Sequence, residues 1–282
     1  MKKLISTIFL LVSSLVFPQD DLLSEIDTLT VDNYEIATFK TLKIVNLETT
    51  KMVSKNTLFF VVAHRFGSIK TGIEDFFGLD QAVTRLNFIY GITDAINLGI
   101  SRSSFEKTYE GSLKIRLLRQ QKGTIPVTMV YYHSLQLNGA LSEENLPMLE
   151  TKHRLSYAHQ LLISSKINKN WSLEVAPTLF HDNLTSLDTQ DNTQYALGLG
   201  GRVKISNRVS LNCDYAFHLN RAQDSPFVNP LSLGVDIETG GHVFQLHFSN
   251  AQPMNVNNYL GQATGDWGRA DIYFGFNLVR VF

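Results

Sequence analysis

The sequence predicts an all-β protein, a transmembrane antiparallel up-and-down β-barrel of about twelve strands. From residue 57 onward, runs of strand length alternate apolar and polar side chains. The connections between these runs alternate between tight and long, and the final run ends on an aromatic residue, Phe282. Because side chains along a strand have a period of two, such runs place one face in hydrocarbon and the other toward a polar interior.

The amino terminus, residues 1–19, has the pattern of a secretory signal peptide. Lys2 and Lys3 precede an uncharged apolar stretch from Leu4 to Phe17. This stretch is shorter than the ~20 residues that a membrane-spanning helix needs. We therefore expect secretion, with the outer membrane of a Gram-negative bacterium as the destination. A short buried helix is the alternative.

Residues 20–56 differ in composition from the rest of the chain. Acidic residues come first, and lysines follow from Lys40 onward. The first half is typical of a disordered periplasmic leader, which could bind a periplasmic partner. Residues 38–53 carry enough β-branched side chains to enter the barrel mouth as a partial plug. Both interpretations remain open from sequence.

Residues 57–282 make up the predicted barrel. We expect strands at 58–66, 84–92, 95–102, 109–119, 125–133, 153–166, 171–180, 195–205, 209–219, 231–239, 242–250 and 270–282. Every even-numbered connection is tight, as at Thr93-Asp94 and Gly240-Gly241, and most odd-numbered ones are longer. Short periplasmic turns and longer outer loops are the rule in outer-membrane barrels. A soluble β-sandwich has no reason to separate loop lengths in this way.

Composition excludes several classes of protein. The formal net charge of −1 offers no basic patch for nucleic acid. The single cysteine, Cys213, excludes an internal disulfide framework, and no Cys/His cluster has zinc spacing. The loop at 181–193 could hold calcium through Asp182, Asp188, Asp191 and Asn192. Their spacing does not match an EF-hand, however, and Asp and Asn are ordinary turn residues, which favours a solvated loop. We predict no metal and no cofactor.

Short motifs recur along the chain from Ala37 to its end. They are ATFK at 37–40, HRFG at 64–67, FFGLDQA at 76–82, RSS at 102–104, LLRQ at 117–120, NPLSL at 229–233, DIETGGHVFQL at 236–246 and GDWG at 265–268. In combination they resemble a family of secreted β-barrels from Gram-negative bacteria, the domain of unknown function "fifty-seven seventy-seven". The sequence departs from the family pattern at Leu278-Val279. The resemblance implies fold and location, and it carries over no catalytic residues.

Strand parity assigns charged side chains to the lumen. The predicted basic wall consists of Arg85, Lys114, Arg116, Arg154, Arg202 and Lys204. The predicted acidic wall consists of Asp214, Asp236, Glu238 and Asp271. Opposed walls of this kind create a transverse field that orients polar solutes and filters ions. The alternative is a packed network of ion pairs that fills a narrow barrel.

Two features do not fit a simple strand pattern. Phe76, Phe77 and Leu79 are too apolar for a free outer loop, so they form a candidate constriction loop or pack against the rim. Parity points His159 toward lipid near the middle of its strand, which only a bulge would correct.

The predicted function is a passive channel for small polar or ionic solutes. A closed structural or partner-docking barrel is the alternative, and a lumenal enzyme is a third reading. Asp214 and His218 lie about 13 Å apart along a strand, and His247 and Ser249 about 7 Å, so neither pair can share a hydrogen bond unaided. The expected partners are outer-membrane lipid and the barrel-assembly machinery, which would recognise Phe282.

Overall fold

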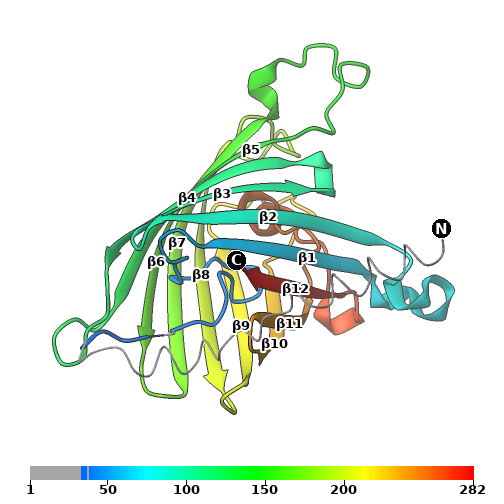
Figure 1. Cartoon of the computed structure of the whole chain (residues 1–282). Coiled ribbons are helices and arrows are strands. Elements are labelled where there is room, and N and C mark those ends of the chain that lie inside the picture. Colours follow the sequence, from blue (N-terminus) through cyan, green and yellow to red (C-terminus); the bar gives the residue numbers. More distant parts are fainter. Residues whose placement is uncertain (1–32, 37) are drawn as a thin grey trace, which may run out of the picture. The chain divides into compact units, whose positions relative to one another are not determined.

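The alternating runs form a closed antiparallel barrel in the computed structural model (Figure 1). The structure describes residues 33–36 and 38–282. Within these residues the wall has twelve strands: β1 (Leu58–Ser68), β2 (Ala82–Thr93), β3 (Ile96–Ser103), β4 (Tyr109–Leu118), β5 (Thr128–Leu137), β6 (Leu155–Lys166), β7 (Trp171–Asp182), β8 (Thr193–Lys204), β9 (Val209–His218), β10 (Leu231–Thr239), β11 (His242–Ser249) and β12 (Tyr273–Val281). The predicted fold class and strand number are confirmed.

The first and last strands close the barrel. β1 pairs antiparallel with β12, in a register that aligns Val61 with Val279 and Ala63 with Asn277. Every other strand pairs with its neighbours in chain order. Because hydrocarbon offers no hydrogen-bond partners, only a closed wall satisfies all strand edges within a bilayer. Within the described ranges, no helix is long and apolar enough to cross a membrane.

Most strand boundaries differ from the sequence prediction by one to four residues, and two of the differences have a clear local cause. β5 begins at Thr128 instead of residue 125, because Pro126 has no backbone N–H to donate to a neighbouring strand. β12 begins at Tyr273 instead of residue 270. There, Ala270 has a left-handed conformation with φ of 54°, which interrupts the extended chain.

The two faces of the wall differ in chemistry, as a period of two predicts. Large apolar side chains remain exposed on the outer face, among them Leu98, Leu117, Leu173, Leu199, Leu211 and Phe244. Polar side chains on the inner face are buried, among them Gln160, Ser164, Asn212, Gln245 and Asn277. Cys213 is exposed. The membrane-facing surface is therefore apolar and the lumen wall is polar.

His159 faces outward, and no bulge reverses it. It is aligned with His133 across the β5–β6 pair. The Tyr131 hydroxyl lies 2.6 Å from Nδ1 of His159, and the rings of His133 and His159 stack with centroids 4.6 Å apart. Neighbouring polar groups on β5 thus satisfy part of this outward-facing ring. His153 lies outside β6, in the short helix η3 (Thr151–Arg154).

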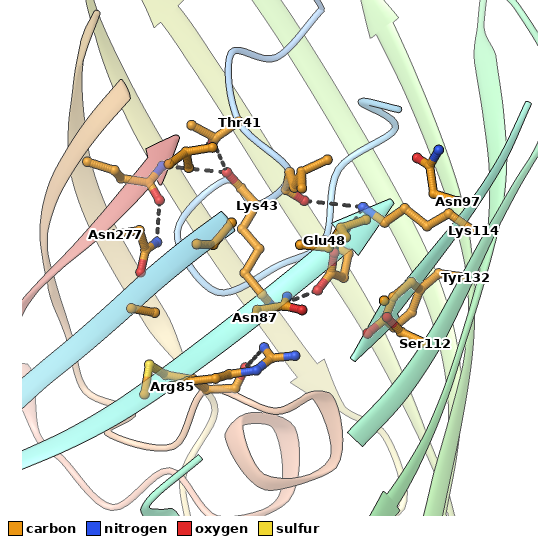
Figure 2. Close-up of a pocket in the computed structure, with 18 of the residues that line it drawn as sticks. Thr41, Lys43, Glu48, Arg85, Asn87, Asn97, Ser112, Lys114, Tyr132 and Asn277 are labelled. Carbon is orange, nitrogen blue, oxygen red and sulfur yellow. Dashed lines mark hydrogen bonds and ion pairs between the residues drawn. The ribbon is translucent and has the colours of Figure 1, made fainter. Parts of the chain in front are cut away.

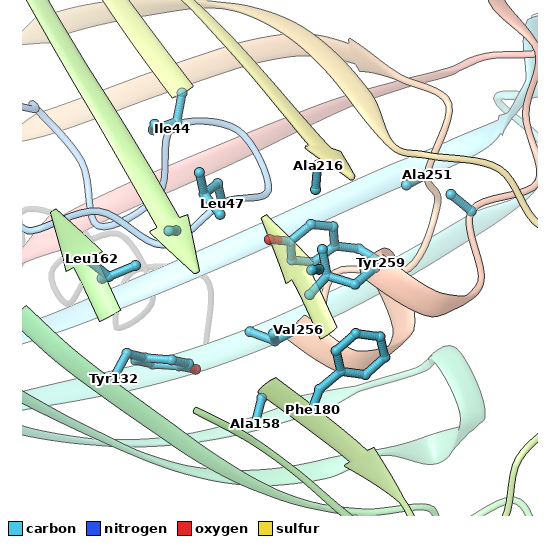
Figure 3. Close-up of a cluster of buried hydrophobic side chains, with 14 of the residues drawn as sticks. Ile44, Leu47, Tyr132, Ala158, Leu162, Phe180, Ala216, Ala251, Val256 and Tyr259 are labelled. Atoms are coloured by element: carbon cyan, nitrogen blue, oxygen red, sulfur yellow. The ribbon is translucent and has the colours of Figure 1, made fainter. Parts of the chain in front are cut away.

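Two segments that do not belong to the wall occupy the lumen. One is the plug segment, residues 39–53, in which Ile44, Val45 and Leu47 are at most 1% exposed. The other is the α3 loop, residues 250–272, which carries the helix α3 (Val256–Gly261). Both meet the barrel wall in one apolar cluster that includes Ile44, Leu47, Ala216, Val256 and Tyr259 (Figure 3). The predicted signal peptide and residues 20–32 lie outside the described residues.

Candidate functional site in the barrel lumen

Asp214 on β9 holds the plug segment by its backbone. Its Oδ2 accepts hydrogen bonds from three consecutive amides, those of Val45 at 2.9 Å, Asn46 at 2.7 Å and Leu47 at 3.0 Å. Successive N–H groups that converge on one oxygen form an anion-binding concavity. Asp214 is only 4% exposed, so this concavity provides most of what stabilises its charge in the lumen.

Further contacts join the plug segment to the strands around Asp214. The amide of Thr50 donates to Glu174 on β7 at 3.0 Å. The side-chain amide of Asn46 donates to the hydroxyls of Ser232 and Ser249, each at 3.0 Å. Lys40, which precedes these residues, forms an ion pair with Glu238 on β10. The plug therefore presents hydrogen-bond donors to the predicted acidic wall.

The plug presents a carboxylate to the opposite, basic side of the lumen. Glu48 lies 2.9 Å from Nζ of Lys114 on β4 and 2.8 Å from Nζ of Lys43 within the plug (Figure 2). Burial alone would raise the pKa of Glu48, but the positive charges of Lys114 and Lys43 together outweigh it and lower the pKa to about 2. Nζ of Lys114 also donates to the carbonyl of Thr49 at 3.0 Å. The charges of the plug thus complement the wall on both sides.

Arg85 and Arg65 complete the basic side. Arg85 on β2 pairs with Glu110 at 2.5 Å and donates to the carbonyl of Met254 in the α3 loop at 3.2 Å. Arg65 on β1 donates to the side-chain oxygens of Asn46 at 3.1 Å and Asn277 at 3.0 Å. Arg65 is missing from the predicted basic wall. Strand parity along β1 directs its side chain inward, so the sequence was sufficient to predict this position.

The other predicted basic residues lie in different surroundings. Arg202 is buried on β8 and donates to Ser210 at 2.9 Å and to the carbonyl of Thr38 at 3.2 Å. Arg116 is half-buried and donates to the carbonyl of Asp94 in a tight turn. Lys204 is the half-buried last residue of β8. The last two therefore lie near the tight-turn end of the barrel.

Two predicted wall residues are not on strands. Arg154 ends η3, where it donates to the carbonyls of Asn138 at 3.4 Å and Leu141 at 2.6 Å. Asp271 precedes β12 and accepts a hydrogen bond from Ser68 at 2.6 Å. Neither residue lies on a strand, because β6 and β12 begin later than the alternating pattern suggested. Asp236, by contrast, lies on β10, where it is 2% exposed and accepts a hydrogen bond from Gln245 at 2.8 Å.

The candidate constriction loop does not enter the lumen. Phe76, Phe77 and Leu79 are 58%, 53% and 40% exposed. The first two lie in the short helix η1 (Ile69–Gly78), which contacts β1 and β12. Phe76 and Phe77 have φ of 43° and 57°, left-handed values that turn the chain sharply at the rim. The alternative of packing at the rim describes this placement better than a constriction.

Two cavities lie beside the segments that occupy the lumen. A cavity of about 40 Å³ lies between the plug and strands β1 to β4 (Figure 2). One water molecule needs ~10–15 Å³ of such space, so this cavity holds only a few. A second cavity of about 170 Å³ lies between the α3 loop and the loops around Asn138 and Thr185. With the plug in place, the lumen is a packed network of ion pairs and hydrogen bonds.

The structure does not bring together either candidate catalytic pair, Asp214 with His218 or His247 with Ser249. The Asp214 carboxylate is occupied by plug amides, and the hydroxyl of Ser249 contacts Asn46 and Ser232. In residues 33–36 and 38–282, both ring nitrogens of His218 and His247 lack a hydrogen-bond partner. In the same part of the chain, no three His, Cys, Asp or Glu side chains are grouped to hold a metal ion.

Comparison with known proteins identifies a family and several similar solved structures. The family model "Membrane bound beta barrel domain (DUF5777)" matches residues 39–282. No curated protein matches the chain. Similar solved structures include a NanC porin (10% identity, 79% of this chain, 98% of that chain, TM-score 0.48). A KdgM porin has 6% identity over 80% of this chain and 99% of that chain, with a TM-score of 0.48. LpxR from Salmonella typhimurium has 10% identity over 80% of this chain and 99% of that chain, with a TM-score of 0.37. Similarity at these TM-scores carries no functional argument.

Proposed function

The chain belongs to the family of membrane-bound β-barrel domains, and on this premise we propose that it is an outer-membrane channel for small polar or ionic solutes, closed by its own plug segment. The observation that carries the proposal is the grip of Asp214 on three plug amides. A carboxylate on the wall binds a separate segment of chain there, and that segment fills the lumen. Residues 1–19 serve as the signal peptide in this proposal.

A polar lumen wall supports conduction once the plug leaves. Serine, glutamine and asparagine side chains line it on many strands, among them Gln136, Gln160, Ser172, Gln194, Asn212 and Asn277. An apolar wall would collapse or dewet without a plug, whereas polar side chains exchange their partners for water at small net cost. The wall is therefore suited to an aqueous path.

The contacts that retain the plug are also of an exchangeable kind. Most of those described are hydrogen bonds and ion pairs, such as Glu48 with Lys114 and Lys40 with Glu238. Apolar contacts anchor the plug as well: Ile44 and Leu47 lie against Gly200 and Gly198, where the wall has no side chains. Leu42 and Val53 belong to a second buried cluster, together with wall residues. The plug thus occupies a matching recess and remains connected to β1 by a short stretch of chain.

A closed structural or partner-docking barrel is the second candidate. The observation that favours it is the network of ion pairs and hydrogen bonds between plug and wall, beside which the described cavity measures about 40 Å³. In that case the plug is a permanent core, and binding takes place on the loops or on residues 20–36. Neither candidate includes a catalytic step.

Single-channel recordings in planar bilayers test the choice. We expect brief, rare openings in the natural protein and about tenfold greater open probability in Asp214→Asn, which weakens three charge-assisted hydrogen bonds. Asp236→Asn is the matched control, because its carboxylate lies on the same wall and bonds to Gln245. Silence of a folded Asp214→Asn barrel would favour the closed barrel over the channel.

A further inference from the structure

A groove of about 540 Å³ crosses the outward face of strands β2 to β6. Its lining on that face is apolar apart from one arginine and a tyrosine hydroxyl: Leu86, Phe88, Ile100, Arg102, Tyr109, Gly111, Leu135, Leu137 and Leu155. Ser101 and Glu110 also line the groove, but their side chains are buried and point into the lumen, so they belong to the bottom of the groove. The groove is therefore a feature of the membrane-facing surface.

Gly111 creates the groove. It is exposed on β4, aligned between Ile100 on β3 and Leu135 on β5. A Cβ atom at Gly111 would meet nothing within 4 Å. Ile100 and Leu135 are 68% and 49% exposed and stand on either side of this gap. The missing side chain at Gly111 thus leaves a slot between two large aliphatic side chains.

Arg102 lies at one end of the groove. It is the residue before the end of β3, next to the short connection to β4. Its guanidinium carbon lies 4.7 Å above the ring of Tyr109, which holds the side chain over the outward face. In the described part of the chain, no carboxylate forms an ion pair with Arg102. Five N–H donors near the membrane surface thus remain available to an anion.

We propose that this groove binds one phosphorylated lipid of the surrounding leaflet, with an acyl chain in the slot at Gly111 and a phosphate on Arg102. Guanidinium and phosphate match in a two-pronged hydrogen-bonded geometry, and the aromatic ring of Tyr109 pre-orients the cation. Arg102 is aligned with Tyr109 and lies two residues along β3 from Ile100, which is aligned with Gly111. The cation and the slot are therefore about 7 Å apart along the strands. This lipid site is separate from the lumen and does not depend on conduction.

The test measures lipid retention by the full-length protein in mild detergent, using native mass spectrometry. The probe is diphosphoryl lipid A, compared with the same lipid after dephosphorylation. Arg102→Gln should lower the bound fraction of the phosphorylated probe by about tenfold and leave that of the dephosphorylated probe unchanged. Gly111→Leu fills the slot and should lower retention of both probes. Heat-modifiable migration on gels verifies that each barrel is folded.

Two matched controls separate the site from general effects. Gly201→Leu places a side chain on an outward-facing glycine of β8, far along the wall, where a Cβ has ordinary contacts. Arg208→Gln removes an exposed arginine from the tight turn after β8. Neither should change retention. The proposal would be overturned if Arg102→Gln and Gly111→Leu retained as much phosphorylated probe as the natural protein. Binding that does not depend on the phosphate, or a loss in both controls, would also overturn it.

Discussion

Glu48 of the plug and Lys114 of the barrel wall form an ion pair, with 2.9 Å between Oε2 and Nζ, inside a lumen where both side chains are about 6% exposed. On the other side of the lumen, Asp214 binds the plug through three backbone amides. The plug is therefore anchored between a wall cation and a wall anion. The two anchors contribute separately to closure, and each can be removed by one substitution.

Glu48→Gln should weaken retention of the plug. Removing one partner of a buried pair leaves Lys114 and Lys43 without their shared carboxylate, at a cost of about 3 kcal/mol. Hydrogen exchange of the amides in residues 44–50 should accelerate accordingly. Glu150→Gln is the control, since Glu150 pairs with Lys152 on the exposed surface. Unchanged exchange in Glu48→Gln would show that this pair does not hold the plug.

Closure should weaken in acid. Burial raises the pKa of Glu48, and the charges of Lys114 and Lys43 outweigh it, so that the pKa falls from 4.5 to about 2. A carboxyl with a depressed pKa stabilises the folded arrangement above its ordinary pKa, and this contribution is lost as the pH falls through 4.5 toward 2. Open probability should therefore rise below about pH 4.5 and stay constant above pH 6. In Glu48→Gln, the rise of open probability in acid should be smaller, because position 48 no longer titrates. A rise as large as in the natural protein would show that other groups cause the pH dependence.

Gly200→Val should displace the plug sterically. A Cβ at Gly200 would lie 2.0 Å from Cδ1 of Ile44, whereas one at the neighbouring Gly201 would lie 3.4 Å from its nearest contact, Cδ2 of Leu173. Overpacking of this kind costs about 1–3 kcal/mol. Protease cleavage within residues 39–53 should become several-fold faster in Gly200→Val and remain unchanged in Gly201→Val. Equal protection in both variants would mean that the recess tolerates a side chain.

Arg202→Gln should change ion selectivity of the open pore. The guanidinium lies buried on β8 and binds the carbonyl of Thr38 and the hydroxyl of Ser210. Without its positive charge, the lumen of the Asp214→Asn barrel retains the carboxylates of Asp236 and Glu238, so cations should pass more readily. Reversal potentials in a salt gradient, measured in the Asp214→Asn background, should shift toward cation preference. Arg208→Gln, in an exposed turn, should show no shift; a shift of equal size there would refute a lumenal role.

Most of the barrel was predictable because its signal is local. Lipid outside and polar groups inside impose a period of two, so strand positions and faces follow from short windows, even for the outward-facing His159. Boundaries were wrong at residues 125–127 and 270–272, where Pro126 and the left-handed Ala270 interrupt the extended chain. The starts of β6 and β12 were both placed too early, so Arg154 and Asp271 were assigned to strands.

The lumen network was not predictable in detail. The plug has irregular backbone and no period, so nothing in its sequence pairs Glu48 with Lys114 or aims three amides at Asp214. The α3 loop is similar: an alternating pattern ends at Ser249, and the inward turn that buries Tyr259 depends on contacts with distant strands. Both segments are defined by tertiary packing, which a single sequence does not encode in any local window.

A reversible cross-link tests the central claim that the plug closes the lumen. Asn46 and Ser232 are joined by a hydrogen bond of 3.0 Å between side chains, so we choose Asn46→Cys with Ser232→Cys as the pair to join plug and wall by a disulfide. In the Asp214→Asn background we expect near silence in planar bilayers when the cysteines are oxidised. Conductance should appear on reduction and vanish on reoxidation. Equal conductance in the oxidised and reduced states would contradict the account.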